Sequence, residues 1–184
     1  MYDKVVFIDR DGVINEDPIG DYVKCWEDFK FLPGVIQALK ELIRAHFQIV
    51  IISNQAGIGD GAYSEKELNE ITKNMLDTFK KEGIHIRGVY YCLHGKEANC
   101  NCRKPKTGLF ETAARDTLFE PASTYFVGDK LTDVQAGKRF GLRTLFVLTG
   151  HGQNDLNRLT PENQPEVVFP SLKEAAAYII ENSH

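Results

Sequence analysis

Short hydrophobic runs alternate along the chain with longer amphipathic stretches. The runs predict buried strands at residues 4–8, 47–52, 87–92, 123–128, 143–148 and 167–169. The amphipathic stretches carry apolar residues at helical spacing, as in the series Val35, Ala38, Leu39, Leu42 and Ile43. Strands that alternate with helices are typical of βαβ units. The sequence therefore predicts an α/β fold with a doubly wound, mostly parallel sheet.

Capping signals place the ends of two helices. Ser64 with Glu67 has the spacing of a capping box, which predicts a long helix through about Lys81. Ser171 with Glu174 has the same spacing and predicts a cap for the final helix. Other helices are expected after Pro33 and Gly34 and at residues 107–118 and 131–140, whereas residues 150–165 are polar and are expected to be irregular.

Composition narrows the class of protein. The chain has 184 residues, enough for one domain with a sizeable core, so a single domain is expected across residues 1–184. Its net charge of −4 argues against non-specific nucleic-acid binding, which needs a basic surface. No signal peptide or membrane span is recognised, so we expect a cytoplasmic protein with reduced thiols. No sequence feature signals oligomerisation, and a monomer is expected.

Two carboxylates follow the first expected strand. In the segment Asp-Arg-Asp-Gly, Asp9 and Asp11 lie two residues apart, and Gly12 allows a sharp turn after them. Such a pair can share a cation, or divide the roles of nucleophile and acid/base catalyst. A polar turn with an incidental pair of acids fits the same residues, so this segment alone does not decide.

Further polar residues lie beyond the later strands. They are Ser53 and Asn54 after the second strand, Arg103 and Lys104 before the fourth, and Asp129 and Asp133 after the fourth. The hydroxyl, the amide and the two cations suit phosphate oxygens. The two acids have a spacing that suits either a metal site or a helix cap. Taken singly, each segment also fits a solvated turn.

The order of these segments resembles the four motifs of the haloacid-dehalogenase-like (HAD) phosphatase superfamily. Asp-x-Asp-Gly, Ser-Asn, Lys-Pro and Gly-Asp-x-x-x-Asp follow one another in the expected structural contexts, from residue 5 to about residue 150. The resemblance implies a Rossmann-like HAD fold that hydrolyses phosphomonoesters. The chain has no room for a large cap domain, so short loops are expected to cover the site.

The resemblance also implies catalytic roles. Asp9 would be the nucleophile that forms an aspartyl-phosphate, and Asp11 the general acid and base. A catalytic Mg²⁺ would be held by the Asp9 carboxylate, the Asp11 carbonyl and Asp129, with Asp133 acting behind these ligands.

Contacts to the substrate follow from the same resemblance. Ser53 and Lys104 would hold oxygens of the transferring phosphoryl group. The other implied contacts are Gly20, Asp21, Tyr22, Val23, Asn54, Gln55, Ala56 and Arg103. Arg103 would recognise the part of the substrate that is not cleaved. The family loop often ends in Arg-Gly, but here Asp60 precedes Gly61, so that basic side chain is absent.

Three of the four cysteines gather in one short segment with a histidine. Cys92, His94, Cys100 and Cys102 supply a Cys3His set, which commonly binds zinc in a closed tetrahedral site. A closed set leaves no open position, so a structural Zn²⁺ is expected. The alternative is a group of free cytosolic thiols beside a surface histidine.

This insertion, placed directly before Arg-Lys-Pro, resembles one subgroup of the superfamily. The subgroup contains histidinol phosphatases and D-glycero-D-manno-heptose 1,7-bisphosphate phosphatases. Residues 14–35 resemble the heptose enzymes, whereas the spacing from His94 to Cys100 equals that of the histidinol group.

The leading hypothesis is a Mg²⁺-dependent phosphatase that removes the C7 phosphate of heptose 1,7-bisphosphate, on the route to lipopolysaccharide. One alternative is histidinol-phosphate phosphatase. The other is a catalytically silent module that binds zinc and phosphate. The second acid, Asp11, argues against that module, because a binding protein does not need it.

Overall fold

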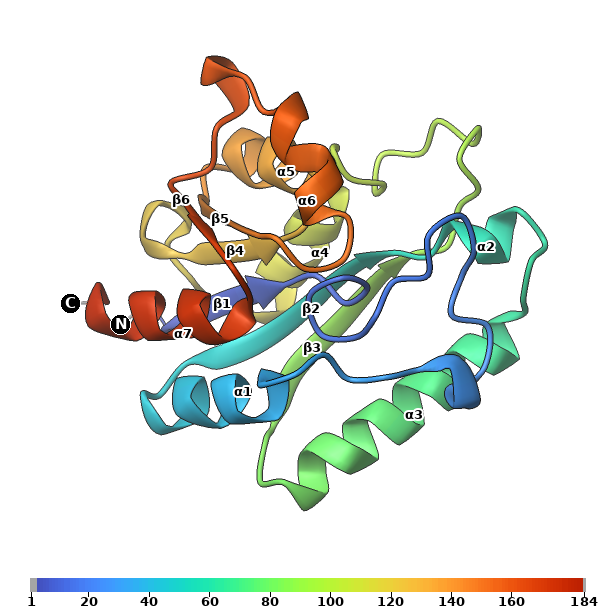
Figure 1. Cartoon of the computed structure of the whole chain (residues 1–184), viewed down its shortest axis with the longest axis horizontal. Coiled ribbons are helices and arrows are strands. Elements are labelled where there is room, and N and C mark those ends of the chain that lie inside the picture. Colours follow the sequence, from blue (N-terminus) through green and yellow to red (C-terminus); the bar gives the residue numbers. More distant parts are fainter. Residues whose placement is uncertain (1–2, 184) are drawn as a thin grey trace.

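A six-stranded parallel sheet forms the centre of the fold, which a computed structural model describes for residues 3–183 (Figure 1). The strands are β1 (Val5–Ile8), β2 (Gln48–Asn54), β3 (Ile86–Cys92), β4 (Tyr125–Gly128), β5 (Arg143–Val147) and β6 (Val167–Phe169). Their order across the sheet is β3-β2-β1-β4-β5-β6, and every neighbouring pair is parallel. The predicted α/β fold with a doubly wound sheet is confirmed.

Helices cover both faces of this sheet. The helices of the described residues are α1 (Val35–Arg44), α2 (Ala56–Gly59), α3 (Glu65–Lys81), α4 (Gly108–Asp116), α5 (Leu131–Phe140), α6 (Gly152–Asp155) and α7 (Leu172–Glu181). In Figure 1, α1, α3 and α7 lie on one side of the sheet, and α4 and α5 on the other.

Alternate residues of β1 enter two separate cores. Val6 and Ile8 pack with α1, α3 and α7, whereas Val5 and Phe7 pack with α4 and α5. The Phe7 ring meets those of Phe110 and Phe119 edge to face, at centroid distances of 5.2 and 5.1 Å. Such pairs add about 0.5–1.5 kcal/mol beyond burial alone. Packing on both faces therefore fixes the strand that carries the Asp-x-Asp segment.

The two capping predictions have different outcomes. At α3, the Ser64 hydroxyl accepts from the Glu67 amide and the Glu67 carboxylate accepts from the Ser64 amide, so the capping box is confirmed. At α7, the Ser171 hydroxyl accepts from the Lys173 amide and donates to the Glu174 carboxylate. Ser171 does cap the helix, but the reciprocal bond of a capping box is not formed there.

Residues 150–165 differ from the expectation of an irregular segment. They contain α6 and two 3-10 helices, η3 (Leu156–Arg158) and η4 (Pro161–Asn163). The short helix α2 and the 3-10 helices η1 (Trp26–Asp28) and η2 (Pro121–Ser123) were also not predicted. One-turn elements carry too few residues to show helical periodicity.

The strand order reverses direction between β1 and β4. These neighbours are far apart in sequence, and the chain leaves them toward opposite sides of the sheet. Ligands of open α/β sheets bind at the carboxyl edge beside such a switch point. No helix within residues 3–183 has the length and apolar character needed to span a membrane.

Candidate active site

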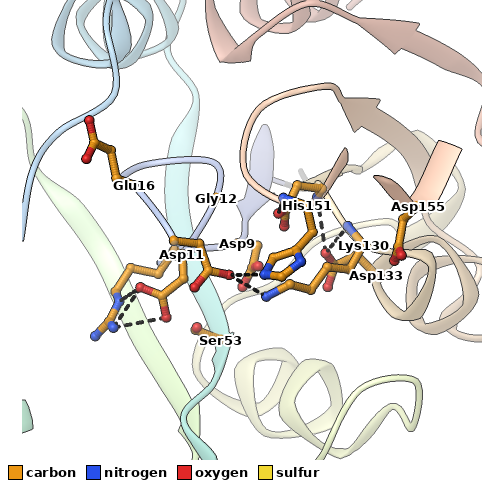
Figure 2. A network of polar contacts seen from close by, with 12 residues as sticks. Asp9, Asp11, Gly12, Glu16, Ser53, Lys130, Asp133, His151 and Asp155 are labelled. Atoms are coloured by element: carbon orange, nitrogen blue, oxygen red, sulfur yellow. Dashed lines mark hydrogen bonds and ion pairs between the residues drawn. The ribbon is translucent and has the colours of Figure 1, made fainter. Parts of the chain in front are cut away.

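A cavity of about 700 Å³ lies at the carboxyl edge of the sheet. Residues that follow β1, β2 and β4 line it, together with segment 17–22 and the Cys-rich loop, residues 92–102. Figure 2 shows part of the polar network here, with Asp9, Ser53, Lys130 and Asp133 close to one another.

Lys104 joins two of the predicted aspartates. Its ammonium Nζ lies 2.8 Å from Asp9 Oδ1 and 2.6 Å from Asp133 Oδ1. All three side chains are at least 96% buried. The loop between β3 and α4 and the turn after β4 are thus tied to the end of β1, although 95 residues separate Lys104 from Asp9.

The buried carboxyl groups of this cluster ionise less readily than exposed ones. Burial raises the pKa of Asp9 to about 6, although the charge of Lys104 acts to lower it. Burial also raises the pKa of Asp129 well above its usual range, and the nearby Asp9 and Asp133 add to the effect. A cation bound among these carboxylates would restore their ionised forms.

The donors around Asp129 suit a hard divalent cation. Carboxylate oxygens of Asp9, Asp129 and Asp133 lie within 4.8 Å of one another. Within residues 3–183, Asp129 Oδ1 is buried without a hydrogen-bond partner, while Oδ2 accepts from the His151 amide at 2.7 Å. Mg²⁺ prefers oxygen ligands of this kind. Asp133 Oδ2 is already occupied, because it accepts from the amides of Asp129 and Lys130.

Gly12 makes room for this arrangement. Its φ of +90° lies in the region that side chains disfavour, and a Cβ there would approach Asp129 Oδ2 to 2.1 Å. The turn after β1 can therefore pack against the end of β4 only with glycine at this position.

Asp11 lies in a different environment from Asp9. Its carboxylate accepts from Arg10 Nη2 at 2.8 Å, from Asn15 Nδ2 at 2.9 Å and from Gln55 Nε2 at 2.7 Å. Burial acts to raise the pKa of Asp11, but the Arg10 charge and these hydrogen bonds outweigh it, so the pKa lies below its usual value. Asp9 and Asp11 are therefore only two residues apart in sequence, but their pKa values are shifted in opposite directions.

Gln55 and Val23 lie outside the cavity wall, although both were expected to contact substrate. Gln55 is 2% exposed, and its amide bonds to Asp11, Arg10 and Ser53. Val23 is 3% exposed and belongs to the core on the α1 side. The structure places Gln55 behind Asp11, where it orients that carboxylate.

The remaining predicted contacts do line the cavity: Gly20, Asp21, Tyr22, Ser53, Asn54, Ala56, Arg103 and Lys104. Asn54 has a clear local function, because its amide accepts from the Lys104 amide at 3.0 Å and donates to the Lys104 carbonyl at 3.1 Å. These two bonds fix the backbone of Lys104 against the end of β2.

Sequence reasoning missed a second group on the cavity wall. Lys130 Nζ lies 2.7 Å from Asp17 Oδ2, and His151 Nε2 lies 3.2 Å from the same oxygen. Figure 2 labels Lys130 and His151. Lys130 stands inside the Gly-Asp-x-x-x-Asp motif, so its position gave a usable signal. Asp17 and His151 come from loops without a motif, and only the fold brings them together.

The thiol segment forms one cluster beside this cavity. The three sulfurs of Cys92, Cys100 and Cys102 lie 3.1–3.6 Å apart, and His94 Nδ1 lies 3.2 Å from Cys102 Sγ. A disulfide would need about 2.05 Å. Sulfurs around one tetrahedral zinc would lie about 3.8 Å apart, given Zn–S bonds of about 2.3 Å. The observed cluster is close to that geometry.

Fold and site together define the class. A parallel sheet that presents an Asp-x-Asp-Gly turn beside a lysine and a Gly-Asp-x-x-x-Asp turn has the arrangement of a HAD-like hydrolase. A HAD-hydrolase-like family model matches residues 101–175.

Individual relatives narrow this class. The chain is 36% identical to a D-glycero-beta-D-manno-heptose-1,7-bisphosphate 7-phosphatase of Haemophilus ducreyi, over 97% of the chain and 100% of that protein. A crystal structure of a D,D-heptose 1,7-bisphosphate phosphatase from B. bronchiseptica, complexed with magnesium and phosphate, superposes with a TM-score of 0.90 at 32% identity. That superposition covers 97% of this chain and 98% of the other.

The histidinol side of the subgroup matches over a shorter length. The bifunctional histidine biosynthesis protein HisB of Legionella pneumophila is 37% identical over 80% of the chain, but over only 42% of its own length. The chain belongs to the family of heptose bisphosphate phosphatases within the HAD-like hydrolases, and it is a phosphatase.

Proposed function

We propose that this phosphatase removes the C7 phosphate of D-glycero-D-manno-heptose 1,7-bisphosphate. The observation that carries the proposal is the match to heptose bisphosphate phosphatases along nearly the whole chain. The buried carboxylates of Asp9 and Asp129 and the ammonium of Lys104 lie at the carboxyl edge of the sheet, where such chemistry needs them. A cytoplasmic location, where the cysteines stay reduced, is part of the proposal.

In the first step, Asp9 attacks the phosphorus atom of the C7 phosphate. Lys104 and Ser53 hold the phosphoryl oxygens, so charge is neutralised where it develops. The bond between the phosphorus atom and the C7 oxygen breaks, and Asp11 gives its proton to that leaving oxygen. Asp11 needs that proton beforehand, and a bound phosphate anion favours it because a nearby negative charge raises a carboxyl pKa.

In the second step, water attacks the aspartyl-phosphate on Asp9. Asp11 accepts a proton from this water, and the Asp9 carboxylate and inorganic phosphate are released. The Arg10 contact, which keeps Asp11 ionised, suits this second step. The same carboxyl group thus serves as acid and then as base.

Asp9, Asp129 and the Asp11 carbonyl would hold Mg²⁺, with Asp133 orienting the turn that carries Asp129. When bound, this ion neutralises the approaching phosphate and permits the attack by an anionic carboxylate. Its fit rests on the unpartnered Asp129 oxygen and on the raised pKa values of Asp9 and Asp129.

We also propose a structural Zn²⁺ in the cluster of Cys92, His94, Cys100 and Cys102. The four donor atoms lie within 4.8 Å of one another, and all four positions of a tetrahedron are supplied by the protein. Cys102 directly precedes Arg103 and Lys104, so the zinc would anchor two predicted substrate contacts.

Histidinol phosphate is the second candidate substrate. It is favoured by the spacing between His94 and Cys100 and by the partial match to HisB. Parallel steady-state kinetics with both heptose bisphosphate anomers and histidinol phosphate test the proposal. We expect kcat/KM for one heptose anomer to exceed that for histidinol phosphate by at least about a hundredfold, because the second phosphate adds binding energy that histidinol phosphate lacks. Equal or better kcat/KM on histidinol phosphate would refute the substrate assignment.

A further inference from the structure

Seven cationic side chains line the cavity: Lys96, Arg103, Lys104, Lys106, Lys130, Arg139 and Arg158. Five of them are already bonded within the protein. Three form ion pairs: Lys104 with Asp9 and Asp133, Lys130 with Asp17, and Arg158 with Asp155. Two donate to neutral groups: Arg139 to the Pro105 carbonyl, and Lys106 to Asn99 and the Cys100 carbonyl. Within residues 3–183, Lys96 and Arg103 are the two lining cations whose charged groups make no hydrogen bond or ion pair.

Arg103 has an unused donor. Its Nη1 is buried and has no hydrogen-bond partner among the described residues. A buried guanidinium nitrogen without a partner costs free energy unless a ligand completes its bonding. The residue lies directly before Lys104, so its side chain belongs to the cavity that holds the reacting phosphate.

Lys96 lies at the cavity rim on the Cys-rich loop. Its ammonium group is 5.7 Å from the centroid of the Tyr22 ring, and both residues line the cavity. The aromatic face stabilises the cation without consuming its three hydrogen-bond donors. Lys96 can therefore still donate to a ligand.

Asp60 fixes both partners of this pair. Its Oδ1 accepts from the Lys96 amide at 3.1 Å, and its Oδ2 accepts from the Tyr22 hydroxyl at 3.1 Å. The loop also packs tightly on the end of α2, since a Cβ on Gly59 would come within 2.0 Å of the Gly95 amide nitrogen. Three segments distant in sequence thus hold Lys96 at one place on the rim.

Arg103 is the residue that the family resemblance assigns to the uncleaved part of the substrate. We propose that Lys96 joins it in binding the second phosphate there, and that Asp60 positions Lys96 for this contact. Arg103 supplies a planar fork and Lys96 a point charge, and together they balance a phosphate dianion. This inference rests on the proposed function, because it assigns the C1 phosphate of the heptose bisphosphate. It makes Lys96 a specificity-determining residue for bisphosphates over monophosphates.

The test compares two substrates of one enzyme: the heptose 1,7-bisphosphate and the same heptose carrying only the C7 phosphate. In Lys96→Met, KM for the bisphosphate should rise about fivefold, the factor expected for an exposed charge contact of about 1 kcal/mol. The kcat on both substrates and the KM for the monophosphate should stay unchanged. Lys96→Arg should recover most of the loss. Lys66→Met, which removes an exposed lysine of α3 that does not line the cavity, is the matched control for charge.

Asp60→Ala separates positioning from charge. Removal of this acid makes the rim more positive, which by itself would lower KM for an anion. If Asp60 positions Lys96, KM for the bisphosphate should instead rise and KM for the monophosphate should not. A fall in KM would overturn the role of Asp60.

The outcomes distinguish this inference from the proposed function. Normal turnover by the wild-type protein, with the KM of Lys96→Met equal to that of Lys66→Met, refutes the subsite alone. An equal rise in KM on both substrates also refutes it, because the contact would not then involve the second phosphate. A wild-type protein that fails to hydrolyse the bisphosphate refutes the proposed function itself.

Discussion

Two aspartates two residues apart carry opposite shifts in acidity. Burial raises the pKa of Asp9 to about 6, whereas Arg10 and two amide donors hold the pKa of Asp11 below its usual value. Pairs of carboxyl groups with divergent pKa values are typical of sites that divide nucleophilic and acid/base roles. The division proposed for Asp9 and Asp11 therefore has a physical basis in their surroundings.

The raised pKa of Asp9 predicts how Mg²⁺ binding depends on pH. Protons compete with the metal below a carboxyl group's pKa, so affinity should be nearly constant above about pH 6 and should fall at least about tenfold per pH unit below it. Isothermal titration calorimetry at pH 5, 6 and 7 measures this, with circular dichroism to confirm that the fold persists. An affinity that does not change between pH 5 and 7 would contradict Asp9 as a ligand.

Asp11→Asn should make the covalent intermediate visible. An amide cannot accept the proton of the attacking water, so hydrolysis of the aspartyl-phosphate should slow by about 10²–10⁴-fold. With an aryl phosphate, whose leaving group needs no proton, phosphate should accumulate on Asp9. Acid quench, borohydride reduction and mass spectrometry should then find homoserine at position 9. The double variant with Asp9→Asn is the control, and a modified residue elsewhere would exclude the nucleophile assignment.

Residues differ in how well their surroundings could be predicted. The sequence motifs identified Asp9, Lys104, Asp129 and Asp133, because each follows a strand or stands in a motif, and the structure brings them together. The motifs could not show that the Gln55 side chain lies behind Asp11, since the direction of a side chain after a strand depends on tertiary packing. The Asp17 contacts to Lys130 and His151 likewise arise only when distant loops meet.

At the scale of elements, periodicity predicted the long helices and the strands, and it failed for one-turn helices. The Cys-rich loop is an intermediate case. Its ligand spacing predicted a cluster, which the structure confirms, but not its docking against α2 and Tyr22. That docking depends on Gly59 and Gly95, where the absence of Cβ allows two backbones to touch.

The zinc proposal predicts a specific effect of ligand removal. Cys100→Ser should reduce bound zinc from about one equivalent to well under half, lower the thermal midpoint, and raise KM because Arg103 and Lys104 lose their anchor. Metal analysis and thermal unfolding measure the first two effects. Cys25→Ser is the matched control, since Cys25 lies outside the cluster. Equal zinc content in both variants would contradict the site.

At the scale of the whole molecule, the strand order explains why the motifs converge. β1 lies between β2 and β4, so segments from residues 9, 53 and 129 meet at one edge of the sheet. Alternation of strands and helices was enough to predict this edge as the site. The identity of the substrate depends instead on the cavity rim, where loops without regular patterns supply the contacts.

The central claim is that the phosphate on C7 is cleaved while the phosphate on C1 is kept. Phosphorus NMR of heptose 1,7-bisphosphate with catalytic protein and Mg²⁺ follows both groups in one sample. The C7 signal should disappear as inorganic phosphate grows, and the C1 signal should persist at constant intensity. Loss of the C1 signal, or two unchanged signals under conditions in which histidinol phosphate is hydrolysed, would contradict the account.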